Sequence, residues 1–148
     1  MFNTIKGKKP QIMCKLGDII VINEYIGDDG TKISKHSFVV INDEPNFIEG
    51  LQYDLVCNVM SSFKSEKQKK KKIKFEENLE IIGEQIISKI STNNKSGYIK
   101  ADQLVYFNKR KIKYYLLGHI TDELLKELMQ IIILLNKKGL LKRNKANL

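Results

Sequence analysis

The segment Ser96–Leu104 places a cation, a carboxylate and an amide within an apolar pattern that is typical of a β-strand. Because side chains alternate along a strand, we expect Lys100 and Asp102 on one face and their apolar neighbours on the other. An ammonium can neutralise phosphate charge, and a carboxylate can accept a proton or orient a cation, so the pair could act on one bound phosphodiester. Gln103 is expected to support the strand or contact the same ligand. The alternative is an exposed ion pair, which is common and contributes little.

Other side chains suited to phosphate chemistry stand beside two further apolar runs. His36 titrates near neutrality and could serve as a base or an acid, and Lys35 precedes it. Ser61 and Ser62 follow the run Leu55–Met60, where their hydroxyls could donate hydrogen bonds to phosphate oxygens. The alternatives are an ordinary surface histidine and serines that only end a strand. His119 is expected to be structural.

The run Lys64–Lys74 contains seven lysines and one glutamate. We expect it to be a solvated, mobile loop unless it meets phosphates. The net charge of +9 favours an anionic partner, with nucleic acid first and a membrane surface second. The candidate nucleic-acid contacts are Lys35, Lys64, Lys67, Lys69, Lys70, Lys71, Lys72 and Gln103.

The 148 residues, 42% of them hydrophobic, predict a single domain with flexible ends at residues 1–15 and 142–148. No apolar run reaches the ~20 residues that span a bilayer, so a cytoplasmic location is expected. Cys14 and Cys57 have no neighbours at metal-ligand spacing. We therefore expect two buried, reduced thiols, no metal site and no cofactor.

These groups must be positioned by a mainly β arrangement that ends in a helix. Turn residues and a polar segment predict a long loop from Gly27 to Ser37. A strand and then a short helix are expected within 75–90. Thr121 can cap a helix that stops at Gly139. The apolar surface of this helix exceeds one stripe, which favours either deep burial or an interface with a second subunit or a partner. Apolar runs predict strands at Ile19–Ile22, Phe38–Ile41, Leu55–Met60, Tyr98–Phe107 and Ile112–Leu117.

Five fragments follow one another along the chain: Gly17–Val21, Phe38–Ile41, Ser61–Ser62, Tyr98–Gln103 and Ile120–Leu125. In this order they resemble the MazF/PemK ribonuclease toxins. The family's counterparts are a Gly-acid opening, a strand after an Arg-Pro pair, a Thr-Ser or Thr-Thr pair, an acid-Gln strand and the start of the last helix. The likeness spans Gly17 to about Leu135. Two features depart from the family: His36-Ser37 stands in place of Arg-Pro, and the interval between Ser62 and Gly97 is long and rich in lysine.

The resemblance implies an SH3-like, partly open β-barrel of the MazF/PemK/CcdB type, with about five to seven strands and a C-terminal helix. It implies the toxin of a type II toxin-antitoxin pair that cuts single-stranded RNA without a metal, leaving 2′,3′-cyclic phosphate and 5′-hydroxyl ends. A homodimer with an RNA groove flanked by Gly27–Lys35 and Lys64–Lys74, and an antitoxin with an acidic tail, are implied as well. The catalytic set would be His36, Ser61, Ser62, Lys100 and Asp102. The alternatives are a non-catalytic nucleic-acid-binding module on the same barrel and a gyrase-inhibitor-like toxin.

Overall fold

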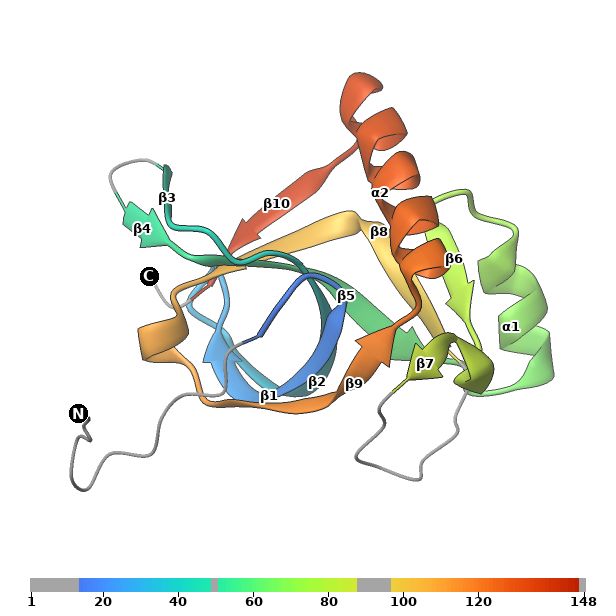
Figure 1. Cartoon of the computed structure of the whole chain (residues 1–148), viewed down its shortest axis with the longest axis horizontal. Helices are drawn as coiled ribbons and strands as arrows, with labels where there is room; N and C mark the ends of the chain where they lie inside the picture. The colour runs from blue at the N-terminus through green and yellow to red at the C-terminus, as the bar shows by residue number, and fades with distance from the viewer. Residues whose placement is uncertain (1–13, 49–50, 88–96, 147–148) are drawn as a thin grey trace.

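The computed structural model describes residues 14–48, 51–87 and 97–146. These residues form a mainly β structure with two α-helices (Figure 1). The strands are β1 (Asp18–Ile26), β2 (Lys32–Asn42), β3 (Asn46–Ile48), β4 (Leu51–Tyr53), β5 (Leu55–Ser62), β6 (Asn78–Ile81), β7 (Ile86–Ile87), β8 (Gly97–Phe107), β9 (Tyr114–Ile120) and β10 (Lys142–Lys145). The helices are α1 (Glu66–Ile73) and α2 (Asp122–Lys137), with 3-10 turns at Gly83–Gln85 and Lys109–Lys111.

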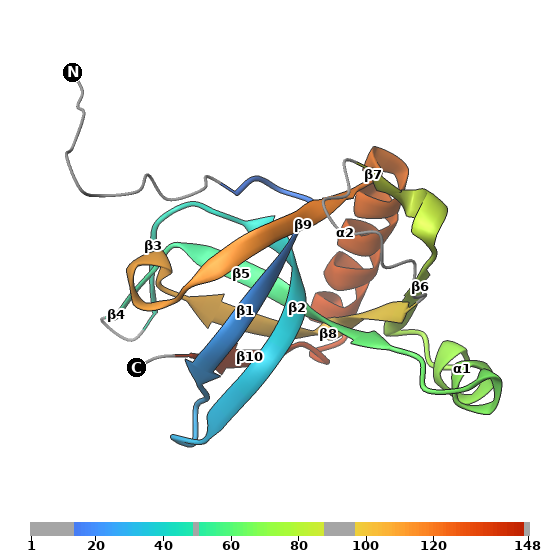
Figure 2. The ribbon, with the colours of Figure 1, turned by 90° about the horizontal axis from the view of Figure 1, so that it is seen from below.

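Eight strands form one sheet in the order β10-β8-β5-β2-β1-β9-β7, and β6 pairs with β8 beside this path. Neighbouring strands are antiparallel except for β10 and β8, which run parallel. The sheet curls on itself, and β3 and β4 form a separate hairpin (Figure 2). A barrel-like, mainly β fold with a C-terminal helix is therefore confirmed, although the large sheet has eight strands where five to seven were expected.

The inner side of the curled sheet is filled by one apolar cluster drawn from β1, β2, β5 and β8. At its centre the rings of Tyr25, Phe38 and Phe107 meet edge to face, with centroids 5.2 to 5.8 Å apart, an arrangement that aromatic quadrupoles favour. Cys14 and Cys57 are buried, free thiols in the same cluster, as expected. Burial raises the pKa of the Cys57 thiol well above its usual value, which keeps it protonated and inert.

Helix α2 covers the other face of the sheet, across β8 and its neighbours (Figure 1). Leu124, Leu128, Ile132 and Leu135 recur at helical spacing and are buried, each contributing about 1.5–3 kcal/mol. The Thr121 hydroxyl accepts a hydrogen bond from the backbone N–H of Leu124 at 3.3 Å. Beyond the last turn, Gly139 has φ of +69°, which glycine adopts without strain. The predicted start and stop of this helix are thus confirmed.

Part of the apolar surface of α2 stays in solvent. Ile133 and Leu134 are 54% and 44% exposed, so burial in the protein's own core accounts for one side of the helix only. No helix among the residues described here is long and apolar enough to cross a membrane.

Two internal segments differ from what the sequence predicted, and a third matches it. Strand β2 already begins at Lys32, so the predicted loop shrinks to the turn Gly27–Thr31, closed by backbone hydrogen bonds between those two residues and at Gly30. The lysine run is a helix, α1, rather than a loop, because Ser65 caps it and contacts with β6 hold it. Within 75–87, β6 and the 3-10 turn at Gly83–Gln85 match the expected strand and short helix.

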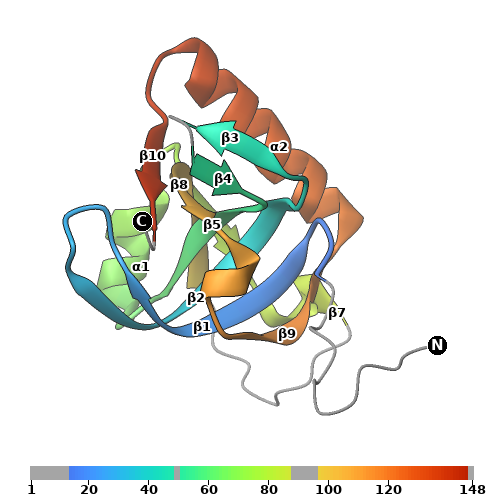
Figure 3. The ribbon, with the colours of Figure 1, turned by 90° about the vertical axis from the view of Figure 1, so that its left-hand side faces the viewer.

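The predicted flexible tail is instead strand β10, which lies along β8 (Figure 3). Ala146 is 1% exposed and belongs to the inner cluster, and its N–H donates to the Tyr106 carbonyl at 2.9 Å. The Lys145 N–H also donates to Asp28 in the β1–β2 turn at 3.2 Å. Strand pairing and the burial of Ala146 together offset the conformational entropy that this polar segment loses when it becomes ordered.

Candidate active site

His36 and Lys100 lie on one face of the curled sheet. Lys100 of β8 pairs with Val59 of β5, and Val59 in turn pairs with Phe38 of β2. Residues paired directly across strands share a face, and so do residues two apart in one strand. His36 therefore faces the same side as Phe38, and their rings lie 5.9 Å apart between centroids.

The charge state of His36 depends on this arrangement. The half-buried imidazole loses hydration, and this burial lowers its pKa from the usual 6.5; the Lys100 ammonium lowers it further. A hydrogen bond with the Lys35 backbone opposes the shift only in part. The imidazole is therefore neutral at physiological pH and able to accept a proton.

Ser61 joins this face, whereas Ser62 does not. Ser61 pairs with Tyr98, two residues before Lys100, so its side chain points to the His36 side; Ser62 alternates to the other face and is exposed. The close approach of β8 to β5 here requires Gly97, since a Cβ at that position would clash with the Ser61 carbonyl. Of the two candidate hydroxyls, the structure brings one to the site.

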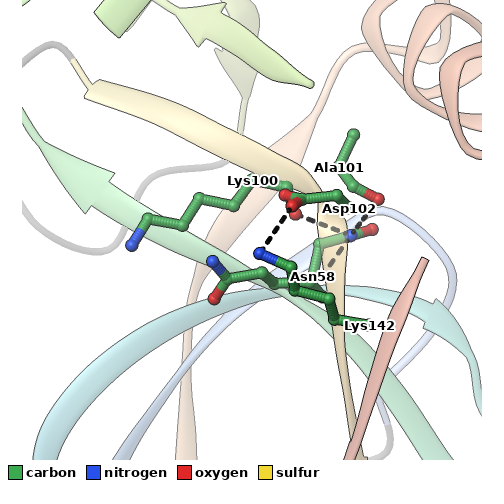
Figure 4. Close-up of polar contacts among 6 residues, drawn as sticks. Asn58, Lys100, Ala101, Asp102 and Lys142 are labelled. Carbon is green, nitrogen blue, oxygen red and sulfur yellow. Dashed lines mark hydrogen bonds and ion pairs between the residues drawn. The ribbon is translucent and has the colours of Figure 1, made fainter. Parts of the chain in front are cut away.

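The structure does not bring Asp102 to Lys100. Its side chain is 13% exposed, and its carboxylate lies 3.7 Å from the ammonium of Lys142 in β10. Figure 4 shows the Lys142 side chain directed at Asp102, while the Lys100 side chain extends away from both. The cause is an irregularity in β8: Asn58 pairs with Leu104 and the next residue, Val59, with Lys100, so residues 101–103 have no counterpart on β5. The expectation that Lys100 and Asp102 act together on one ligand, which rested on the alternation of side chains along a strand, is therefore wrong.

Asn58 holds this bulge in place, and the sequence reasoning missed it. Its side-chain amide donates to the carbonyls of Lys100, Ala101 and Gln103 at 3.0, 3.2 and 3.3 Å (Figure 4). Asn58 is fully buried, and its Oδ1 atom has no hydrogen-bond partner among the residues described. Gln103 thus supports the strand through its backbone. An amide inside the apolar run Leu55–Met60 was the available signal, because buried amides need a specific partner.

The candidate RNA-contacting lysines divide by position. Lys35 alternates away from His36 and lies 5.8 Å from the Tyr115 ring centroid. In α1, Lys69 is bound to Glu80 at 3.0 Å and Lys72 is half-buried. The candidates Lys64, Lys67, Lys70 and Lys71 remain exposed.

The second histidine serves the fold, as expected. His119 Nδ1 lies 2.8 Å from the carboxylate of Asp18, which is 3% exposed and also accepts the Lys15 N–H at 2.8 Å. Gly17, with φ of +88°, brings β1 close to this ring, and a Cβ there would lie 2.9 Å from it. The Gly-Asp opening of β1 is thereby tied to β9.

The site is therefore a neutral imidazole, an ammonium and a hydroxyl on one face of a barrel-like β-sheet. Across residues 14–48, 51–87 and 97–146, no group of three or more His, Cys, Asp or Glu side chains forms a metal site. No protein-family model matches the chain, and neither does the sequence of any curated protein. The resemblance to the MazF/PemK toxins accordingly rests on the ordered sequence fragments alone.

Proposed function

We propose that this protein is a metal-independent, sequence-selective endoribonuclease and the toxin of a type II toxin-antitoxin pair, on an SH3-like barrel of the MazF/PemK type. The observation that carries the proposal is the neutral His36 imidazole beside the Lys100 ammonium on one face of the sheet. The ordered fragments that resemble the family support it independently.

The three side chains have complementary roles in cleavage. His36 accepts the proton of the ribose 2′-hydroxyl, whose oxygen then bonds to phosphorus. Lys100 neutralises the charge that develops on the phosphorane, and Ser61 donates a hydrogen bond to a phosphate oxygen. The bond to the 5′-oxygen breaks as that oxygen takes a proton from a solvent water molecule, and His36 then returns its proton to solvent. The products are a 2′,3′-cyclic phosphate and a 5′-hydroxyl.

Two protein partners belong to the same proposal. The exposed Ile133 and Leu134 on α2 offer apolar area to a second copy of the chain in a homodimer. The net charge of +9 suits an antitoxin whose acidic tail covers the RNA-binding face.

A cleavage assay tests the proposal. We expect the purified protein to cut single-stranded RNA in the presence of EDTA and to leave cyclic phosphate ends. His36→Ala and Lys100→Ala should each lower the rate at least ~100-fold, as loss of a base or a charge-stabilising group does. Lys126→Ala is the matched control, because Lys126 is exposed on α2, across the sheet from the site.

A non-catalytic RNA-binding module is the second candidate. It is favoured by the pairing of Asp102 with Lys142, which leaves His36 without a carboxylate close to it among the residues described. RNA that stays intact but bound would support this module and refute the nuclease.

A further inference from the structure

The lysines of α1 and of its C-cap, Lys74, are arranged on two opposite sides of the helix. At about 100° per residue, positions 67, 70, 71 and 74 fall within one face. Lys67, Lys70, Lys71 and Lys74 are all exposed. Lys69 lies about 200° from Lys67 on this wheel and faces the body of the protein instead.

The opposite side of α1 fixes the helix on the sheet. Lys69 binds Glu80 of β6 at 3.0 Å, and its ammonium lies 5.9 Å from the Phe63 ring centroid. Phe63 in turn stacks on Tyr98 of β8, with centroids 5.0 Å apart. The Asn78 side chain donates to the Lys72 carbonyl at 3.0 Å. These contacts give the exposed lysine face a fixed orientation rather than that of a loose tail.

The exposed lysine face makes no stabilising contact by burial or ion pairing with the described part of the chain. None of the side chains of α1 is buried. Lys67, Lys70, Lys71 and Lys74 are neighbours at spacings of three and four, where like charges repel, and among the described residues no carboxylate forms an ion pair with any of them. An anionic partner would relieve this repulsion and release counterions.

The helix that carries the lysine face lies next in the chain to the strand that carries part of the candidate active site. Strand β5 carries Ser61 and leads directly through Phe63 into α1 (Figure 2). Tyr98, on which Phe63 stacks, shares a face with Lys100. An RNA strand bound at Lys100 can therefore continue along α1.

We propose that Lys67, Lys70, Lys71 and Lys74 bind the sugar-phosphate backbone of single-stranded RNA flanking the scissile bond, and that Lys69 positions the helix without contacting RNA. This inference rests on the proposed nuclease function for its ligand. It assigns α1 a contribution to affinity that is independent of base sequence. Ile73 is the only apolar residue of α1, so the helix lacks the apolar face with which amphipathic helices enter membranes.

Salt-dependent binding tests the inference. The probe is a single-stranded RNA with 2′-O-methyl groups throughout, which cannot be cleaved by attack of the 2′-oxygen. If all four lysines contact phosphates, changing them together to Gln should reduce the slope of log affinity against log salt by about 2.8, at about 0.7 per contact. Between 50 and 200 mM salt, the unaltered protein should then lose about 50-fold more affinity than the variant.

Two further variants isolate the effect. Changing Arg110, Lys113, Lys126 and Lys137 to Gln removes the same charge from exposed positions outside α1 and should leave the slope within about one unit of its original value. The exchange Lys69→Glu with Glu80→Lys keeps the ion pair and the net charge, so it should also preserve the slope.

An unchanged slope in the α1 variant would overturn the inference. So would tight binding to vesicles rich in phosphatidylserine, if that binding depends on the same four lysines and RNA binding does not. The two proposals fail separately. A reduced slope without cleavage of ordinary RNA removes the nuclease and leaves the lysine face, whereas cleavage with an unchanged slope does the reverse.

Discussion

Replacing Asn58 with aspartate should severely destabilise the protein at neutral pH, although the two side chains have nearly the same shape. The Asn58 amide donates to three backbone carbonyls, and its residue is fully buried. The hydrogen bonds donated by its two amide protons stabilise the fold by about 1–3 kcal/mol, at ~0.5–1.5 kcal/mol per hydrogen bond. A buried, unpaired carboxylate facing those carbonyls adds a penalty of about 3–5 kcal/mol. The free energy of unfolding should therefore fall by about 4 kcal/mol or more, which lowers Tm by about 10 °C or more for a chain of this size.

The loss should depend on pH with a defined sign. Burial and the three carbonyl oxygens raise the pKa of the new carboxyl above its unfolded value of about 3.9. The folded variant then holds a proton that the unfolded chain has released, so the free energy of unfolding decreases as pH rises from about 4 through the raised pKa. Thermal unfolding followed by circular dichroism at pH 5 and pH 7 should show the variant closer to the original protein at pH 5.

Two other variants separate charge from hydrogen bonding. Asn23→Asp adds the same charge at an exposed position of β1 and should change the free energy of unfolding by less than about 0.5 kcal/mol. Asn58→Leu removes the donors without adding charge, so it should cost about 1–3 kcal/mol and show no such pH dependence. An Asn58→Asp variant that melts within about 2 °C of the original protein at pH 7 would refute the role given to this amide.

Two further predictions concern the candidate active site and the close contact of β8 with β5 beside it, at Gly97. Because the pKa of His36 lies below 6.5 and its neutral form is the proposed base, cleavage should rise with pH through that lowered pKa, at lower pH than for an unperturbed imidazole. Lys100→Gln should lower the plateau of the rate and shift the rise to higher pH. pH-rate profiles in which both proteins rise at the same pH would exclude this coupling. Gly97→Ala should lower the free energy of unfolding by about 1–3 kcal/mol, measured by urea unfolding, because its Cβ would clash with the Ser61 carbonyl. Gly30→Asn is the control, because φ there is +82° and the space is open, and it should change the free energy of unfolding by no more than about 1 kcal/mol. Equal losses in the two variants would contradict the clash.

The sequence predicts those elements whose local signals agree with their packing. Helix α2 carries its own cap at Thr121, its own apolar stripe and its own stop at Gly139, so its ends could be assigned without knowing its neighbours. The strands around Val21, Val40 and Val59 are similarly marked by apolar runs. In each of these elements, composition and burial point to the same structure.

Elements held by distant contacts could not be predicted in this way. The residues of α1 and β10 are mostly lysine and other polar types, which locally indicate solvated chain. Besides its Ser65 cap, what orders α1 is packing on the next element, β6, through the ion pair of Lys69 with Glu80. What orders β10 is pairing with β8 and the burial of Ala146. Neither partner could be inferred from the spacing of charges alone.

The displacement of Asp102 from Lys100 has a chemical consequence for the site. If the two had faced one another as alternation suggested, the carboxylate would neutralise the ammonium and remove one of the two causes that lower the pKa of His36. The bulge held by Asn58 instead delivers Asp102 to Lys142, and among the described residues Lys100 keeps no ion-pair partner. An uncompensated ammonium adds to the effect of burial in lowering the pKa of His36, and its own charge stays available to a phosphate. A buried amide on β5 that bonds only to backbone carbonyls thereby helps to set the protonation state of the proposed base on β2.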